Sequence, residues 1–211
     1  DRPELPPVAL DEDTWGTYFM SSRDLCALDV IPSLVEGGLD SFKIEGRTRS
    51  VYYLSQVVRA YRMAIDACAE ALAGGATAGS ELVPQESRRA ISFVDGRGFM
   101  PGFLKGPLPQ NYTSTHVAAA GGCVAAQVLD FDSASSSFRV NVKNPFSMDD
   151  KLELMTPSGM VPCEVSGLLD FRGAAADRLN PGTEGRVIVQ GDVLKNTGNA
   201  DFGFFVRIIT A

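Results

Sequence analysis

The hydrophobic pattern of this chain changes about halfway along, near Asn111, and this change restricts the possible folds more than any other feature. Upstream, apolar residues recur with the period of a helix, most clearly over residues 50–73. From residue 117 onward, short apolar runs are separated by turn residues, as is typical of strands. A chain of 211 residues can hold two small domains. The pattern therefore predicts an α/β segment over residues 1–111 and a small antiparallel β-barrel over residues 112–211.

The upstream half is predicted to alternate strands with helices. Short apolar runs predict strands at residues 18–20 and 41–45, with a short helix at 29–36 between them. The long helix at 50–73 follows, with Ser50 well placed as its N-cap. This order is typical of a parallel α/β layer, which needs further strands beside it to bury both of its faces.

Beyond the long helix, the sequence predicts one more helix and then only strands. Residues 74–80 are a linker of small residues, a helix is expected at 84–93, and the glycines and prolines of residues 97–111 indicate a loop. With no helix between them, the later strands favour a small barrel or sandwich. These strands are predicted at residues 138–143, 152–155, 161–165, 186–190 and 204–209.

The stretch from Ser41 to Arg47 is the strongest candidate for a functional site. In a strand, Phe42 and Ile44 would face one way, and Lys43 and Glu45 the other. Lys43, Glu45 and Arg47 would then lie where a strand gives way to a helix, the position at which α/β proteins place their sites. An ordinary surface ion pair explains the same residues equally well.

Composition excludes several classes of protein. The formal net charge of −7 argues against a protein that grips nucleic acid through a broad basic face, although a local basic patch is compatible with it. No run of about 18 apolar residues occurs, and the first residues lack the layout of a signal peptide. We therefore expect a cytoplasmic protein with no membrane segment.

The cysteines and the single histidine restrict the chemistry further. Cys26, Cys68, Cys123 and Cys163 are widely spaced and form no C-x-x-C pair, which excludes a zinc ribbon. Cys26 follows a polar turn, whereas the other three lie in apolar segments where cysteine behaves as a small hydrophobe. His116 is the only histidine, and no nucleophile motif accompanies it, so a hydrolase with a serine or cysteine triad is not expected.

Several segments together resemble the collagenase-like peptidases of family U32. The resemblance extends over most of the chain, and the matching segments lie at 16–26, 34–47, 52–53, 57–61, 97–99, 102–103, 142–144 and 152–159. Family members carry a TIM-type barrel followed by a small β-barrel. The resemblance thus implies an α+β chain made of the last βα units of such a barrel and a small antiparallel β-barrel. It also implies that the chain is the C-terminal half of a longer parent protein.

The resemblance implies two kinds of chemistry for the parent protein. The family name indicates a peptidase, but some members are hydroxylation proteins, one branch acting on tRNA uridine with prephenate as oxygen donor and another in quinone biosynthesis. Those members hold a four-iron four-sulfur cluster through four cysteines, and Cys26 matches the last of these. Cys68, Cys123 and Cys163 do not match the others, so no cofactor is expected in this chain alone.

Three hypotheses about function follow. In the first, Arg47 holds a carboxylate or phosphate, Lys43 adds positive charge, and Glu45 orients one of them or acts as a base. In the second, the β-barrel is a binding module for RNA or protein, although its aromatic–basic pairs are limited to Phe138-Arg139 and Phe171-Arg172. In the third, the chain is a truncated product.

The partners expected on either functional hypothesis are the upstream half of the parent protein and tRNA or a protein substrate. The α/β segment by itself is an incomplete sheet with unpaired edges. Self-association through those edges is therefore expected as well.

Overall fold

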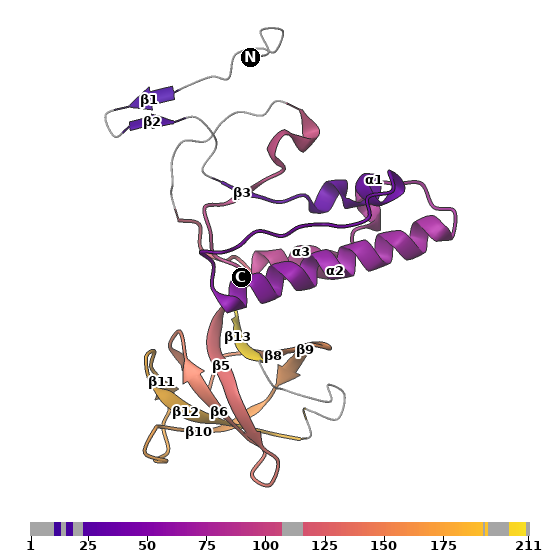
Figure 1. Ribbon diagram of the computed structural model, residues 1–211. Helices are drawn as coiled ribbons and strands as arrows, with labels where there is room; N and C mark the ends of the chain where they lie inside the picture. Colours follow the sequence, from indigo (N-terminus) through magenta and orange to yellow (C-terminus); the bar gives the residue numbers. More distant parts are fainter. Residues whose placement is uncertain are drawn as a thin grey trace. The chain divides into compact units, whose positions relative to one another are not determined.

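A computed structural model describes residues 11–13, 16–18, 23–106, 116–191, 193 and 203–209 (Figure 1). The chain divides into two compact units, each made of segments that are not contiguous in sequence. The predicted domain boundary near Asn111 lies outside the described residues. The first unit comprises Asp1–Arg47, Val57–Ala90 and Asp95–Ala118, and the second comprises Thr48–Gln56, Ile91–Val94 and Ala119–Ala211.

The first unit contains two pairs of short strands. Strands β1 (Asp11–Asp13) and β2 (Gly16–Tyr18) pair in antiparallel fashion. Strands β3 (Asp24–Leu25) and β4 (Phe99–Met100) pair in parallel, and they come from distant parts of the sequence. Of the strand predicted at residues 18–20, only the first residue is described, as the end of β2.

The predicted helices are confirmed. The long helix α2 begins one residue after Ser50, and the N–H of Tyr53 donates to Ser50 Oγ at 3.1 Å, so Ser50 is its N-cap. None of the helices in the described part of the chain is long and apolar enough to cross a membrane. The α-helices are α1 (Ile31–Glu36), α2 (Val51–Ala73) and α3 (Gln85–Ser92), and the short 3-10 helices are η1 (Leu28–Val30), η2 (Ser80–Leu82) and η3 (Gly102–Lys105).

The prediction of a strand at residues 41–45 was wrong. Phe42 and Ile44 are partly buried and Lys43 and Glu45 are exposed, so the expected alternation of faces is present. No strand of the described residues pairs with this segment, which runs as irregular chain between α1 and α2. Alternation arises in any extended segment that lies on an apolar surface, whereas a strand also needs backbone hydrogen bonds to a neighbour.

The second unit contains a seven-stranded antiparallel sheet that curls as a half-barrel, which confirms the predicted antiparallel strands but not a closed barrel (Figure 1). The strand order is β10-β12-β6-β5-β13-β8-β9. Strands β7 (Phe146–Ser147) and β11 (Arg178–Leu179) form a separate antiparallel pair. The strands of the main sheet are β5 (Gly122–Asp132), β6 (Ser137–Val142), β8 (Leu152–Thr156), β9 (Gly159–Cys163), β10 (Val165–Leu169), β12 (Glu184–Val189) and β13 (Phe204–Ile208).

One face of this sheet is lined by a continuous apolar core. In β6, Phe138, Val140 and Val142 are fully buried, whereas the intervening Arg139 and Asn141 are partly exposed. The ring of Phe138 meets Phe205 edge-on with 5.2 Å between centroids. Burying one large apolar side chain contributes about 1.5–3 kcal/mol. Buried and partly exposed residues thus alternate with a period of two along β6, which places the apolar side chains of this strand in the core.

A smaller apolar cluster joins the start of α2 to the same sheet within the second unit. Tyr52 packs edge-on against Phe204 with 5.4 Å between ring centroids, and its hydroxyl donates to the carbonyl of Phe93 at 3.2 Å. Met155 and Val206 complete the cluster. The phenolic hydroxyl is thus satisfied while the ring is buried, as a buried tyrosine requires.

Candidate functional site

The three charged residues predicted from the sequence lie together. Glu45 is the central member, with its Oε1 3.1 Å from Arg47 Nε and its Oε2 3.8 Å from Lys43 Nζ. All three side chains are exposed, Lys43 by 84%, Glu45 by 57% and Arg47 by 85%. Exposed ion pairs of this kind contribute only about 0–1 kcal/mol, so the two cations can leave Glu45 at little cost. We refer to Lys43, Glu45 and Arg47 as the charged triad. The charged triad can therefore offer positive charge to an anionic group.

Cys26 lies on a different segment, directly after β3. Its N–H donates to the carbonyl of Met100 at 2.8 Å, which continues the parallel pairing of β3 with β4 by one residue. The next N–H, of Ala27, donates to Tyr61 Oη at 2.7 Å. The backbone is thus held on both sides of Cys26 at the carboxyl end of two parallel strands, the end at which α/β proteins bind ligands.

A nearly buried carboxylate lies two residues before Cys26. Asp24 is 10% exposed in its side chain and accepts a hydrogen bond from Arg97 Nη2 at 2.9 Å. A Cβ on Gly96 would lie 2.7 Å from Asp24 Oδ2, so glycine at this position lets the backbone approach the carboxylate closely. Residues two apart on a strand share a face. The side chain of Cys26, directly after β3, is therefore expected on the same side of the chain as the carboxylate of Asp24.

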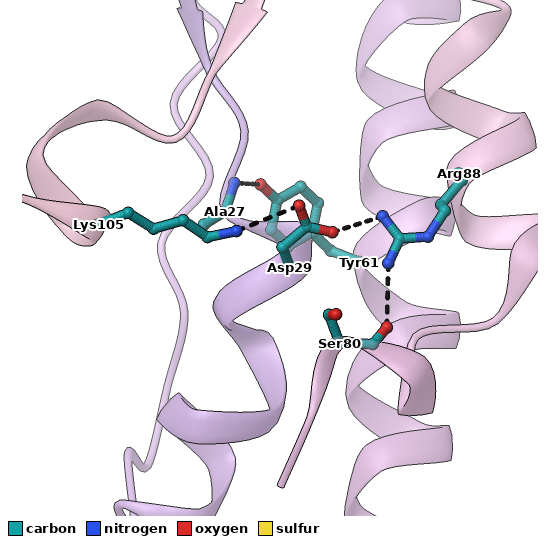
Figure 2. Close-up of polar contacts among 6 residues, drawn as sticks. All are labelled: Ala27, Asp29, Tyr61, Ser80, Arg88 and Lys105. Atoms are coloured by element: carbon teal, nitrogen blue, oxygen red, sulfur yellow. Dashed lines mark hydrogen bonds and ion pairs between the residues drawn. The ribbon is translucent and has the colours of Figure 1, made fainter. Parts of the chain in front are cut away.

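A second carboxylate in the first unit lies between two cations (Figure 2). Asp29 Oδ1 accepts a hydrogen bond from Arg88 Nη1, and Asp29 Oδ2 lies 3.3 Å from Lys105 Nζ. Arg88 also donates to the carbonyl of Ser80 at 3.0 Å. The hydrogen bond from Arg88 holds the pKa of Asp29 below its ordinary value, and that from Lys105 adds to the effect. We refer to Asp29, Ser80, Arg88 and Lys105 as the Asp29 cluster.

Sequence reasoning missed the Asp29 cluster. Its members come from η1, η2, α3 and η3, and Asp29 is 59 residues from Arg88 and 76 from Lys105. Helix η1 begins shortly after β3, and η3 begins shortly after β4. The Asp29 cluster therefore joins the chain segments that follow these two strands. Local sequence carries no signal for such a contact.

The cysteines of this chain do not fit a four-thiolate cluster. Cys68 is fully buried on α2, and Cys123 and Cys163 lie in β5 and β9 of the second unit. Burial raises the pKa of the Cys68 thiol, and it raises the pKa of Cys163 to about 11, which disfavours their thiolates. Among the described residues, no three histidine, cysteine or carboxylate side chains are gathered as metal ligands. Cys26 could provide one ligand only.

Comparison with known families identifies both parts of the chain. The model of Peptidase family U32 matches residues 3–114, and that of the Peptidase family U32 C-terminal domain matches residues 123–197. The chain belongs to Peptidase family U32. The resemblance noted in the sequence is thereby confirmed, since the U32 matches include the stretch from Ser41 to Arg47 as well as Cys26.

Curated relatives carry two kinds of name. The tRNA hydroxylation protein P of Escherichia coli K12 is 34% identical over 166 residues, which are 78% of this chain and 35% of the relative. Its namesake from Haemophilus influenzae is 32% identical over 169 residues, 79% of this chain and 35% of the relative. A collagenase of Porphyromonas gingivalis is 32% identical over 111 residues, 53% of this chain and 25% of the relative. The chain thus spans about a third of the length of the two tRNA hydroxylation proteins.

Proposed function

We propose that this U32 chain is the C-terminal portion of a protein that hydroxylates tRNA. The observation that carries the proposal is the extent of the matches. Relatives named tRNA hydroxylation protein P align over 78% and 79% of the chain, through both units, whereas the collagenase aligns over 53%.

The parallel pair β3 and β4 fits this proposal as a remnant of the last βα units of a TIM-type barrel. In such barrels the reacting groups lie at the carboxyl ends of the strands. Cys26 and the Asp29 cluster lie beyond that end of the pair. Two strands form too small a sheet to bury both faces, so the upstream part of the parent protein, or another copy of this chain, would complete the layer.

The charged triad supplies the anion-binding function in this proposal. Arg47 presents a planar guanidinium that can hold a phosphate or carboxylate with two parallel hydrogen bonds. Lys43 adds positive charge, and Glu45 keeps the two cations in place until the anion displaces it. Both proposed ligands are anionic, since tRNA is a polyanion and the oxygen donor carries a carboxylate. Positive charge of this kind would help to bind either of them.

Cys26 supplies one thiolate of a four-iron four-sulfur cluster in this proposal, and the other ligands come from outside this chain. What supports it is the fixed backbone on both sides of Cys26, through the hydrogen bonds to Met100 and Tyr61. Because the chain itself offers a single suitable thiol, no reaction step is assigned to the cluster.

The proposal is tested with a chimera of the Escherichia coli relative. The segment that aligns with this chain is replaced by the chain, and the chimera is expressed in a strain that lacks the native protein. Nucleosides from total tRNA are then analysed by mass spectrometry for hydroxylated uridine. We expect the modification to be restored, and to be lost again with Cys26→Ser. A folded chimera that restores none of it would contradict the proposal.

A peptidase is the second candidate, because one matching relative is a collagenase. The same purified chimera, incubated with gelatin, separates the two functions. Cleavage of gelatin without hydroxylated tRNA would favour the peptidase, whereas hydroxylated tRNA without cleavage favours the function proposed here.

A further inference from the structure

An exposed aromatic ring with a cation against it lies in the loop between β10 and β11. Phe171 is 65% exposed, although rings of this size are usually buried. The guanidinium carbon of Arg172 lies 5.0 Å from the centroid of the Phe171 ring. An aromatic ring and a guanidinium group side by side are the two groups with which proteins hold a single-stranded base and its phosphate.

The tip of this loop, residues 170–174, is held rigid by its own hydrogen bonds, and we refer to it as the Phe171 loop. The N–H of Asp170 donates to the carbonyl of Ala174 at 2.9 Å, and the N–H of Gly173 donates to the carbonyl of Asp170 at 2.9 Å. Asp170 Oδ1 accepts two further bonds, from the N–H of Arg172 at 2.8 Å and of Ala174 at 2.9 Å. A loop ordered in advance loses little entropy when it binds a ligand.

A further guanidinium lies on the sheet beside this loop. Leu169, two residues before Phe171, is paired directly with Arg186 on β12, which in turn is paired with Arg139 on β6. Two arginines directly opposite one another repel, so the sheet needs nearby negative charge. Arg139 lies 2.7 Å from Asp130 and 3.0 Å from Glu184, its carboxylate partners, and Asp132 interacts electrostatically with Arg186.

Arg186 makes a different hydrogen bond from Arg139, its partner on β6. Its Nη1 donates to the neutral Ser137 Oγ at 3.1 Å. Both Arg186 and Leu169 are partly exposed, whereas Val187 and Leu168 beside them are buried, which places Arg186 on the outer face of the sheet. The guanidinium of Arg186 therefore lies on the outer face of the sheet opposite Leu169, with the exposed carboxylate of Glu184 two residues before it on the same strand.

We propose that the Phe171 loop is an RNA contact, in which an unpaired base stacks on the ring of Phe171 and adjacent phosphates bind Arg172 and Arg186. The choice of tRNA as the RNA rests on the proposed function. Stacking suits a chain with a formal net charge of −7, because base–aromatic contact needs no broad basic surface.

The test uses the full chain and an unmodified tRNA transcript, with binding measured by fluorescence anisotropy at several salt concentrations. Phe171→Ala is expected to weaken binding roughly fivefold or more, the loss that follows from removing one base–aromatic stack. Phe171→Trp is expected to retain binding. Phe103→Ala is the matched control, since Phe103 is 61% exposed on η3, and it is expected to bind as the unaltered chain does.

The salt dependence tests the role of Arg172 separately. Removing one phosphate contact with Arg172→Gln is expected to weaken binding and to lower the slope of log affinity against log salt concentration by about one. The inference is overturned if the unaltered chain binds no tRNA, if Phe171→Ala binds as well as the unaltered chain, or if Phe103→Ala causes the same loss.

The chimera separates this inference from the proposed function. If the chimera hydroxylates tRNA and Phe171→Ala changes neither tRNA binding nor the tRNA concentration for half-maximal rate, the loop assignment fails and the function stands. If Phe171→Ala weakens tRNA binding but the chimera makes no hydroxylated uridine, the loop assignment stands and the function fails.

Discussion

At the scale of residues, the same arrangement of one carboxylate between two cations occurs twice in the described part of the chain, with different consequences. Glu45 joins Lys43 and Arg47, which are its neighbours in sequence, and all three are exposed. Asp29 joins Arg88 and Lys105, which reach it from distant segments. Breaking the first group frees two cations for a ligand, whereas breaking the second separates segments of the first unit. We therefore assign binding to the triad and stability to the Asp29 cluster.

Asp29→Asn is expected to destabilise the chain at neutral pH. The pKa of Asp29 is lowered from 3.8 by Arg88 and Lys105, so its stabilising contribution is present above that value and is lost as the pH falls through the lower, folded-state pKa. The difference in unfolding free energy between variant and unaltered chain should thus shrink below about pH 4. Urea unfolding at a series of pH values measures it.

Asp66→Asn provides the control for this experiment. Asp66 pairs with Arg62 one turn away on α2, and such pairs contribute about 0.2–0.5 kcal/mol. A loss at pH 7 no larger for Asp29→Asn than for Asp66→Asn would contradict the structural role of the Asp29 cluster.

At the scale of elements, features built from residues close in sequence could be predicted, whereas features that depend on distant residues could not. Helix α2 was predictable because its apolar period and its cap at Ser50 both lie within the helix and the residue before it. The segment from Ser41 to Arg47 has the alternation of a strand, but a strand is defined by a partner, which this sequence segment does not encode. The charged residues of the triad were found because they are close in sequence, and the Asp29 cluster was missed because its members are not.

The N-cap gives a direct test of the first of these elements. Ser50→Ala removes the oxygen that accepts the N–H of Tyr53, and we expect a loss of about 1 kcal/mol in unfolding free energy. Ser55→Ala is the control within α2, because its hydroxyl bonds only to the carbonyl of Val51 in the helix interior, where alanine is favoured. Equal losses from the two substitutions, measured by urea unfolding, would argue against the cap.

Two glycines in adjacent strands test the packing of the sheet. A Cβ on Gly185 of β12 would lie 2.8 Å from Leu179 Cδ1 and 2.9 Å from the carbonyl oxygen of Leu169. Gly185→Ala should therefore cost about 1–3 kcal/mol. A Cβ on Gly167 of β10 would meet only the side chain of Ile188, at 3.2 Å, so Gly167→Ala should cost less. Thermal unfolding of the two variants compares them, and the reverse order would contradict this packing.

At the scale of the whole molecule, the chain combines a parallel strand pair in the first unit with a curled antiparallel sheet in the second, and the two U32 family models match residues 3–114 and 123–197. The antiparallel sheet could be predicted because its alternation is local. The assignment of the parallel pair to a barrel could not be made from these residues alone, since two short strands are common to many folds. The resemblance to U32 proteins is what suggests a barrel, and that assignment stays a proposal, as do the roles of Cys26 and the triad.

The chimera assay tests the central claim most directly when it includes the triad. The chimera that carries this chain should restore hydroxylated uridine in tRNA, and Arg47→Lys should reduce the amount, because lysine cannot reproduce the bidentate contact of a guanidinium with an anion. Arg62→Lys, on the exposed surface of α2, is the matched control and should leave the modification unchanged. Absence of hydroxylated uridine in tRNA from cells that contain the folded chimera would contradict the account.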